Sequence, residues 1–151
     1  MARRTQTEAQ QMMPQEEFTF TVRNDLSEVD SLHEKVKGFG RQLGLPEKFI
    51  FEVNLAAEEL FTNIVLYGFE DKDDHAVDVF LRCDEGRLRM RIEDDGKPFN
   101  PLDAGDPDLS SPPEDRSVGG LGVYLAEKVM DRIHYERRGN RNVTSLVKKL
   151  V

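Results

Sequence analysis

Two polar side chains, Glu59 and Asn63, stand inside a long segment of periodic apolar residues and could do chemistry together. They are four residues apart, so on a helix they lie on one face, one turn above the other. A carboxylate can take a proton from a hydroxyl or a water, and an amide oxygen can bind a hard cation such as Mg²⁺ that bridges to phosphate. Taken alone, such a pair is more typical of a solvated polar helix face. Its meaning depends on what the rest of the chain places beside it.

A second carboxylate, Asp94, ends an apolar row. Leu88, Met90 and Ile92 alternate with polar residues, which is typical of a half-buried strand, and the alternation puts Asp94 on the same inward side. Burying a carboxylate without partners would cost on the order of several kcal/mol or force it to protonate. Either the protein or a ligand must therefore supply hydrogen-bond donors to Asp94.

A glycine cluster follows a long proline-rich stretch. Residues 97–118 hold five prolines with Asp, Ser and Gly, and a loop of this kind inside a compact domain is usually a lid or a binding loop. Gly119-Gly120-Leu121-Gly122 comes next, directly before residues with helical spacing. Free backbone N–H groups and the positive end of a helix dipole suit an anion such as phosphate. The cluster is neither a Walker A sequence nor a Rossmann fingerprint.

The elements that must position these residues follow from periodicity. We predict a strand at 18–22, a helix from Ser27 to about Leu43, a central helix between Pro46 and Gly68, a hairpin across 76–92, a helix after Gly122 and a C-terminal hairpin across 133–150. The helix after Pro46 has apolar residues on more than one side, so we expect it to be buried centrally. Residues 1–17 are polar and are predicted to be a disordered leader, with the domain at 18–151.

Composition narrows the class of protein. A chain of 151 residues fits one domain that can bury a core without disulfides. Cys83 is the lone cysteine, and neither an apolar N-terminal run nor a stretch of membrane-span length is present, which points to a cytoplasmic protein that does not act at a membrane. A net charge of −8 argues against nucleic acid as the partner. A protein or small-molecule partner is expected instead.

The three polar elements, in this order, resemble a known family. Glu59-Leu-Phe-Thr-Asn63 resembles the N box, Asp94-Asp95-Gly96-Lys97-Pro98 the G1 box and Gly119-Gly120-Leu121-Gly122 the G2 box of the GHKL ATPase/kinase superfamily. Within it, the chain is most similar to the small anti-sigma factor serine/threonine kinases, from Phe18 to Leu150. The resemblance implies the Bergerat ATP-binding fold. We therefore expect an α/β (α+β) two-layer sandwich, with a mixed, mainly antiparallel sheet and three helices on one of its faces.

The resemblance also implies a role for each matching residue. Glu59 would be the general base that polarises the attacking hydroxyl, and Asn63 would bind the Mg²⁺ that bridges the phosphates of ATP. Asp94 would accept the adenine amino group, and Gly96 would let the backbone approach the base. The phosphates would lie beneath the lid, at about residues 97–118, against Gly119, Gly120, Leu121 and Gly122.

Two positions, Pro98 and Tyr67, depart from the family pattern, and the role of a third residue, Arg116, is open. Pro98 stands where a second glycine is frequent, which is common among the anti-sigma-type members. Tyr67 stands where the small kinases often carry His, which would change contacts to the lid or the phosphates. Arg116, just before the glycines, could reach a phosphate or a partner protein, and equally could be a solvated lid residue.

Three functions compete. The favoured one is a Mg·ATP-dependent serine/threonine protein kinase whose substrate is a small anti-sigma factor antagonist, and which could also sequester a sigma factor. The alternative is a nucleotide-sensing module that switches a partner without turnover. A histidine-kinase catalytic domain acting in trans ranks third, because His33, His75 and His134 do not lie in a phosphoacceptor helical hairpin. The resemblance further suggests a homodimer, although no apolar stripe in the chain is left over to support one.

Overall fold

Five strands form one sheet in the order β1-β2-β3-β5-β4. The structure is a computed structural model that describes residues 16–103 and 120–150. The strands are β1 (Glu16–Arg23), β2 (Ala76–Asp84), β3 (Arg87–Asp94), β4 (Arg132–Arg138) and β5 (Arg141–Lys149). Residues 1–15 of the predicted leader lie outside the described part of the chain. Glu16 and Glu17 belong to β1, where they pair with Cys83 and Arg82.

The predicted two-layer α/β fold is confirmed, with one refinement: all four strand pairings are antiparallel, so the sheet is not mixed. The reason lies in where β5 sits. β3 and β4 are joined across a helix and run in the same direction, which would make them a parallel pair if they were neighbours. The C-terminal hairpin instead inserts β5 between them, and β5 runs antiparallel to both.

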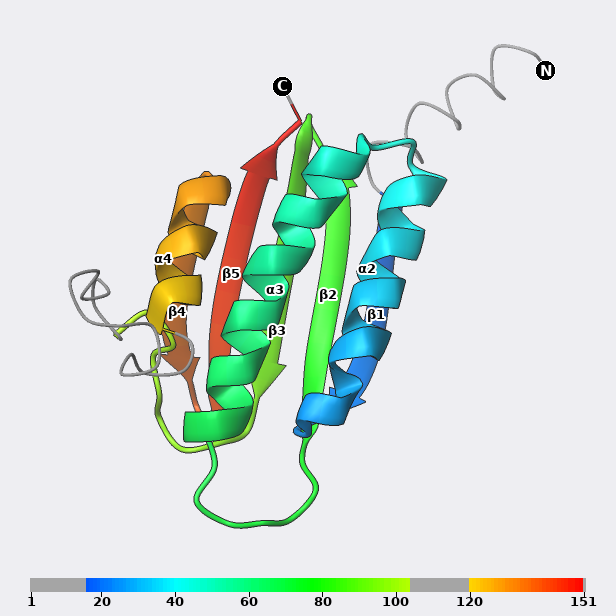
Figure 1. Cartoon of the computed structure of the whole chain (residues 1–151). Coiled ribbons are helices and arrows are strands. Elements are labelled where there is room, and N and C mark those ends of the chain that lie inside the picture. The colour runs from blue at the N-terminus through cyan, green and yellow to red at the C-terminus, as the bar shows by residue number, and fades with distance from the viewer. Residues whose placement is uncertain (1–15, 104–119, 151) are drawn as a thin grey trace.

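Three α-helices of the described residues cover one face of this sheet (Figure 1). They are α2 (Val29–Gln42), which continues a short 3-10 turn η2 (Leu26–Glu28), α3 (Glu47–Tyr67) and α4 (Gly120–Val129). As predicted, α3 is the central helix, and it packs against both α2 and α4. It follows Pro46 and ends at Gly68, whose N–H donates to the Ile64 carbonyl.

The core lies between α3 and the inward rows of the strands. Alternation in β2 and β3 buries every second side chain, as the period of a strand requires. The buried apolar residues of the sheet are Phe20, Val22, Val77, Val79, Leu81, Cys83, Leu88, Met90, Ile92, Val143 and Leu146. Val79, Ile92 and Leu60 are at most 1% exposed, so the middle of α3 and the middle of the sheet form the best-shielded part of the molecule.

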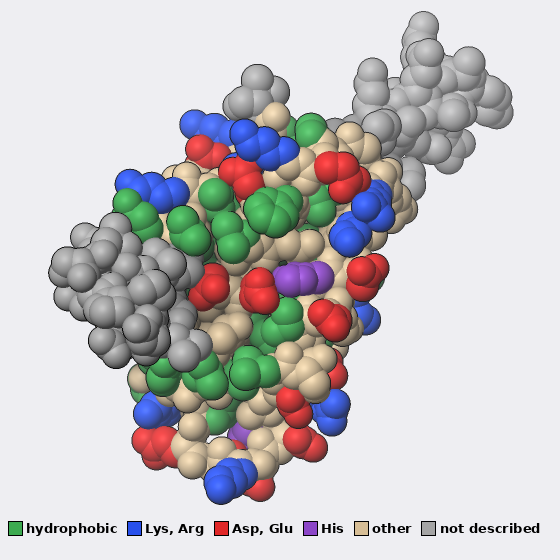
Figure 2. Space-filling model, in the orientation of Figure 1, with side chains coloured by type: hydrophobic (Ala, Val, Ile, Leu, Met, Phe, Trp, Pro, Cys, Tyr) green, Lys and Arg blue, Asp and Glu red, His purple; other side chains and the backbone are tan. Residues whose placement is uncertain are grey.

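The face covered by the helices is chemically mixed. Acidic and basic side chains are interspersed there, and hydrophobic side chains also reach the surface (Figure 2). Among the large apolar residues, Phe51 is 67% exposed, whereas Leu66 and Leu125 are less so. No helix among the described residues is long and apolar enough to span a membrane.

Candidate nucleotide site

Glu59 and Asn63 lie one turn apart on one face of α3, as their spacing predicted. Asn63 is only 2% exposed, and Glu59 is half-buried. Glu59 Oε2 and Asn63 Oδ1 are both shielded from solvent and accept no hydrogen bond from any described residue. Buried polar atoms are almost always paired, because an unmade hydrogen bond costs about 1–3 kcal/mol. Two unpaired acceptors on neighbouring turns are therefore available to a ligand that could supply the missing partners.

The environment of Glu59 also changes its acidity. Burial raises the pKa of the Glu59 carboxyl, and the negative charge of its neighbour Glu58 raises it further. A carboxylate whose pKa is raised towards neutrality is a stronger proton acceptor than an exposed glutamate. Since no described cation is paired with Glu59, its charge is available to a proton or to a ligand rather than to a structural ion pair.

Asp94 is buried at the inner end of β3, as the alternation predicted, and is 1% exposed. Its Oδ1 accepts hydrogen bonds from the Gly96 backbone N–H at 2.9 Å and from Asn142 Nδ2 at 3.0 Å. Burial nevertheless raises the pKa of the Asp94 carboxyl, and these two hydrogen bonds only partly offset that effect. Both of these hydrogen bonds end on Oδ1. The described residues thus provide only part of the hydrogen bonding that a buried carboxylate requires, and Oδ2 is available to a donor on a ligand.

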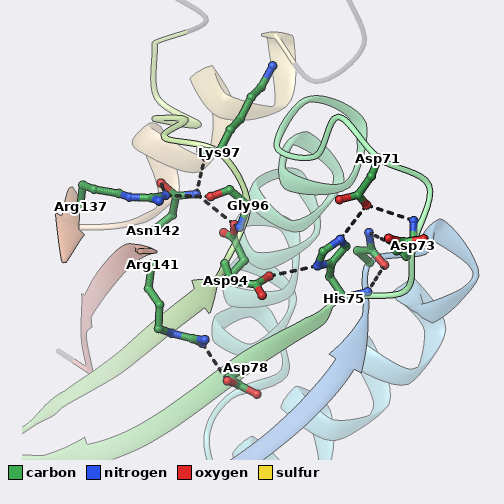
Figure 3. A network of polar contacts seen from close by, with 12 residues as sticks. Asp71, Asp73, His75, Asp78, Asp94, Gly96, Lys97, Arg137, Arg141 and Asn142 are labelled. Carbon is green, nitrogen blue, oxygen red and sulfur yellow. Dashed lines mark hydrogen bonds and ion pairs between the residues drawn. The ribbon is translucent and has the colours of Figure 1, made fainter. Parts of the chain in front are cut away.

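Asn142 organises this end of the site, and the sequence reasoning missed it. It is 2% exposed and lies directly opposite Asp94 in the pairing of β3 with β5. Its Nδ2 also donates to the Lys97 carbonyl at 2.8 Å, and its Oδ1 accepts from Arg137 Nη1 (Figure 3). The same Oδ1 also accepts from Tyr135 Oη and from the Phe99 backbone N–H. Carrying the alternation of β5 back from Leu146 through Thr144 would have placed Asn142 on the buried row, so the signal was present in the sequence.

The turn after Asp94 can be formed only by glycine. A Cβ on Gly96 would lie 2.3 Å from the Gly68 carbonyl oxygen and 2.9 Å from Asp94 Oδ1. The Lys97 N–H donates to the same Gly68 carbonyl at 3.0 Å, and Arg137 Nη1 donates to the Gly96 carbonyl at 2.8 Å. The end of β3 is thus tied to the C-terminal end of α3. This tie places Asp94 on the same side of the sheet as the α3 residues Glu59 and Asn63.

Replacing Gly96 with Ala should therefore lower the free energy of unfolding by about 1–3 kcal/mol, because backbone atoms must move to admit the methyl group. Nucleotide affinity should fall with it, since the turn positions Asp94. Gly38→Ala in α2 is the matched control: a Cβ added there would meet nothing within 4 Å, and a helical Gly→Ala change should stabilise. Chemical denaturation of the two variants measures both effects. A Gly96→Ala protein as stable as the wild type would contradict the close approach.

A histidine holds the loop beside this turn. His75 Nε2 lies 2.7 Å from Asp71 Oδ1 (Figure 3). His75 Nδ1 lies 3.2 Å from Asp95 Oδ1. The ring stacks on Phe69 with centroids 4.5 Å apart, and the His75 backbone N–H donates to Asn24 Oδ1. The hydrogen bond to Asp71, and then the charges of Asp71 and Asp95, raise the pKa of His75. An imidazolium between two carboxylates thus joins the α3–β2 loop to the end of β3.

This ion pair predicts a pH dependence of stability. Because the folded pKa of His75 is raised, its contribution is fully present below the ordinary histidine pKa and is lost as pH rises through the raised folded pKa. His75→Gln should thus lower the melting temperature at about pH 6 and change it little at about pH 9. Thermal unfolding across that range measures the difference. An equal loss at both ends would show that stacking on Phe69, and not charge, carries the effect.

The remaining predicted residues divide between described and undescribed parts of the chain. Gly120 and Gly122 lie in the first turn of α4, together with Leu121, whose side chain is not described. In Figure 1 this N-terminal end of α4 points to the same end of the molecule as the C-terminal end of α3, against which α4 packs. Gly119, Arg116 and the lid from residue 104 onward lie outside the described residues. Tyr67 lies beside Phe99 at the start of the lid, with ring centroids 6.2 Å apart.

The described residues contain no group of three or more His, Cys, Asp or Glu side chains that could hold a metal ion by themselves. Two oxygens at this site, Glu59 Oε2 and Asn63 Oδ1, accept no hydrogen bond from the described residues, and Asn63 Oδ1 is the amide oxygen of the two. An amide oxygen suits Mg²⁺, which typically takes one or two protein ligands and completes its octahedron with phosphate oxygens and water. The donor set thus fits a Mg²⁺ brought by a nucleotide rather than a metal bound by the protein alone.

Comparison with known proteins decides the family. A model of the histidine kinase-like ATPase domain matches residues 22–148, which is most of the chain. The chain therefore belongs to the histidine kinase-like ATPase family. The predicted resemblance of the chain to the GHKL superfamily is confirmed by this match.

Relatives within the family are named as kinases. The serine-protein kinase RsbW of Listeria monocytogenes is 27% identical over 107 residues, covering 67% of this chain and 68% of that protein. The serine/threonine-protein kinase BtrW of Bordetella bronchiseptica is 30% identical over 96 residues, covering 64% of this chain and 68% of that protein. The RsbW of Bacillus velezensis is 29% identical over 119 residues, covering 76% and 72%.

A solved structure shares the fold. The RsbU and RsbW domains of Rv1364c from Mycobacterium tuberculosis align with a TM-score of 0.64 at 13% identity, over 88% of this chain and 31% of that one. At 13% identity, this match supports a shared fold and nothing more. It agrees with the antiparallel sheet and the one-sided helices described above.

Proposed function

We propose that this protein is a cytoplasmic, Mg·ATP-dependent serine/threonine protein kinase that phosphorylates a small anti-sigma factor antagonist. The observation that carries the proposal is the pair of buried acceptors, Glu59 Oε2 and Asn63 Oδ1, left without partners one turn apart on the central helix. The names of its relatives as serine and serine/threonine kinases support the choice of reaction. Sequestration of a sigma factor and a homodimeric state remain predictions from the family resemblance.

The residues of the site would bind ATP at two ends. Asp94 would accept a hydrogen bond from the adenine amino group, at the carboxylate whose burial calls for a donor. Gly120 and Gly122 would present backbone N–H groups at the start of α4, where the helix dipole favours the negative phosphates. Asn63 Oδ1 would bind the Mg²⁺, which supplies charge neutralisation across the phosphate oxygens when bound.

Glu59 would act on the protein substrate. Its carboxylate would orient the attacking serine or threonine hydroxyl and accept its proton as the bond to the γ-phosphorus forms and the bond to the leaving ADP oxygen breaks. The raised pKa of Glu59 suits this role, because a base titrating closer to neutral pH takes up a proton more readily.

The test is incubation with γ-labelled ATP, Mg²⁺ and each antagonist encoded near the gene, followed by phosphoamino-acid analysis. We expect acid-stable phosphoserine or phosphothreonine on an antagonist. Label on histidine, which is acid-labile, would instead support a histidine-kinase catalytic domain acting in trans. Absence of transfer to every such antagonist would overturn the kinase proposal.

The alternative, a nucleotide-sensing module, shares the pocket but not the turnover. It is favoured by the same orphan acceptors, since these call for a ligand and do not by themselves require a reaction. Calorimetric measurement of ATP binding, together with an assay of ATP turnover, separates the two functions. A sensing module would bind ATP, change its affinity for a partner and leave the ATP intact, whereas a kinase would convert the bound ATP to ADP when its substrate is present.

A further inference from the structure

A basic cluster lies on the face of the sheet opposite the helices. Four cationic side chains surround a hollow of about 300 Å³ that Val147 and Asp131 also line; they are Arg87, Arg89, Arg132 and Lys149. Strand alternation places Arg87, Arg89 and Lys149 on this outer face, because Leu88, Met90 and Leu146 of the same strands point into the core. Arg132 on β4 lies directly opposite Val147 of β5 and so shares this face. We refer to the four cations as the basic patch.

The register of the sheet brings like charges together at the basic patch. Arg87 lies directly opposite Lys149 on β5, and Arg89 lies directly opposite Arg82 on β2. Like charges at directly opposed positions of neighbouring strands destabilise a sheet. Asp84 lies within 3.3 Å of both Arg82 and Arg89, so the uncompensated repulsion falls on the Arg87–Lys149 pair.

The acids near the basic patch do not neutralise it. Asp84 pairs with Arg82 at 3.0 Å and with Arg89 at 3.3 Å, so one carboxylate serves two guanidinium groups. Asp131 Oδ2 accepts a hydrogen bond from the Lys149 backbone N–H at 2.7 Å. Among the described residues, the side chains of Arg87, Arg132 and Lys149 have no ion-pair partner within 4.0 Å.

The other end of the same face is compensated. Arg141 bridges Asp78 at 2.8 Å and Glu93 at 3.1 Å, and Arg138 pairs with Glu136 at 2.7 Å. Arg91 pairs with Glu93 as well. Among the described residues of this face, uncompensated positive charge is thus local to one end, in a chain whose net charge is −8.

We propose that the basic patch binds an acidic segment of a partner protein. Guanidinium groups recognise carboxylates through two parallel hydrogen bonds, and three arginines and a lysine converge here from three adjacent strands. Neighbouring strands lie about 4.8 Å apart, so the patch is about 10 Å wide and fits two or three carboxylates. Val147 supplies an apolar floor for the stems of the bound side chains.

A short acidic segment suits the surroundings better than a nucleic acid. Asp84 and Asp131 border the basic patch, and the chain as a whole is acidic, so an extended polyanion would be repelled as soon as it left the patch. The patch also lies across the sheet from Glu59 and Asn63. A partner segment can therefore occupy it while the nucleotide site is filled, and the proposal does not rest on the kinase function.

Fluorescence anisotropy with a labelled hexaglutamate peptide at low salt tests the proposal. We expect binding that weakens as salt is added, and a loss of affinity of about tenfold when Arg87→Gln and Arg132→Gln are combined, since each exposed charge contributes modestly. The matched control combines Arg91→Gln and Arg138→Gln, which removes the same charge from paired cations on the same face and should change affinity less than about twofold. Removing opposed like charges should leave the melting temperature of the first double variant at or above that of the wild type.

Three results would overturn the proposal. The wild type could fail to bind hexaglutamate at all. The two double variants could lose affinity equally, which would make the effect one of net charge. A single-stranded oligothymidine could bind more tightly than hexaglutamate and lose its affinity in the Arg87→Gln, Arg132→Gln protein, which would assign the patch to nucleic acid.

Discussion

Replacing Asp94 with Asn is expected to weaken ATP binding by about 100-fold while leaving the fold intact. A charge-assisted hydrogen bond is lost, and the new side-chain NH₂ group faces the adenine amino group, so that two hydrogen-bond donors oppose each other. An asparagine at position 94 keeps an Oδ1 that can accept from Gly96 N–H and from Asn142 Nδ2, the two contacts that the structure shows. The second carboxylate oxygen becomes an NH₂ group, which cannot accept from an adenine amino group.

The same Asp94→Asn replacement should raise the stability of the folded protein. Burial raises the pKa of Asp94, so the ionised carboxylate is disfavoured in the folded protein, and a neutral amide removes that cost. Calorimetric titration with ATP and a thermal melt of the same sample separate the two effects. Asp95→Asn is the control: it removes the adjacent, exposed carboxylate and should alter ATP affinity little. Wild-type affinity in Asp94→Asn would rule out the adenine contact.

Replacing Glu59 with Gln is expected to reduce phosphotransfer by about 10²–10⁴-fold, the usual contribution of a general base, with ATP affinity nearly unchanged. Glutamine keeps the shape and an acceptor oxygen but cannot take up the hydroxyl proton. Glu58→Gln is the matched control, since Glu58 is the adjacent carboxylate on α3 and lies 3.6 Å from His33 Nε2. Its transfer rate should stay close to that of the wild type.

The raised pKa of Glu59 adds a signature that a purely structural role would not give. Above the raised folded pKa, the buried charge destabilises the wild type, so Glu59→Gln should melt at a higher temperature. As pH falls through the folded pKa towards the ordinary glutamate value, the wild-type side chain protonates and the difference should vanish. A variant that is less stable than the wild type at neutral pH would mean that the charge of Glu59 has a partner in the folded protein.

The sequence allowed the two ends of the site to be predicted because each follows a local rule. Helical spacing placed Glu59 and Asn63 on one face of α3, and strand alternation placed Asp94 on the buried row. Neither rule depends on which elements are neighbours. The central position of α3 followed in the same way, from the width of its apolar surface, whereas the α/β class was implied by the family resemblance.

What the sequence reasoning missed depends on contacts between distant segments. Asn142 meets Asp94 only because β5 inserts between β3 and β4, and that insertion also makes the sheet wholly antiparallel. The contact of Gly96 with the Gly68 carbonyl joins a turn to a helix end that is distant in the sequence, and His75 meets Asp95 in the same manner. Periodicity describes one segment at a time, so it could not supply these pairings.

The basic patch likewise depends on pairings between distant segments of the chain. Each of its cations lies on an outward strand position, where a charged residue is ordinary. Only the register of three strands reveals that they converge on Val147 and that Arg87 faces Lys149. A surface that looks ordinary in the sequence thus becomes a candidate partner site once the sheet is assembled.

The most direct test of the kinase proposal is single-turnover transfer from γ-labelled ATP to the purified antagonist, measured for the wild type and for Glu59→Gln with ATP binding verified in both. We expect the wild type to place the label on a serine or threonine of the antagonist, and Glu59→Gln to bind ATP equally well and transfer it at least about 100-fold more slowly. Equal transfer by both proteins would contradict the role of Glu59 as the base.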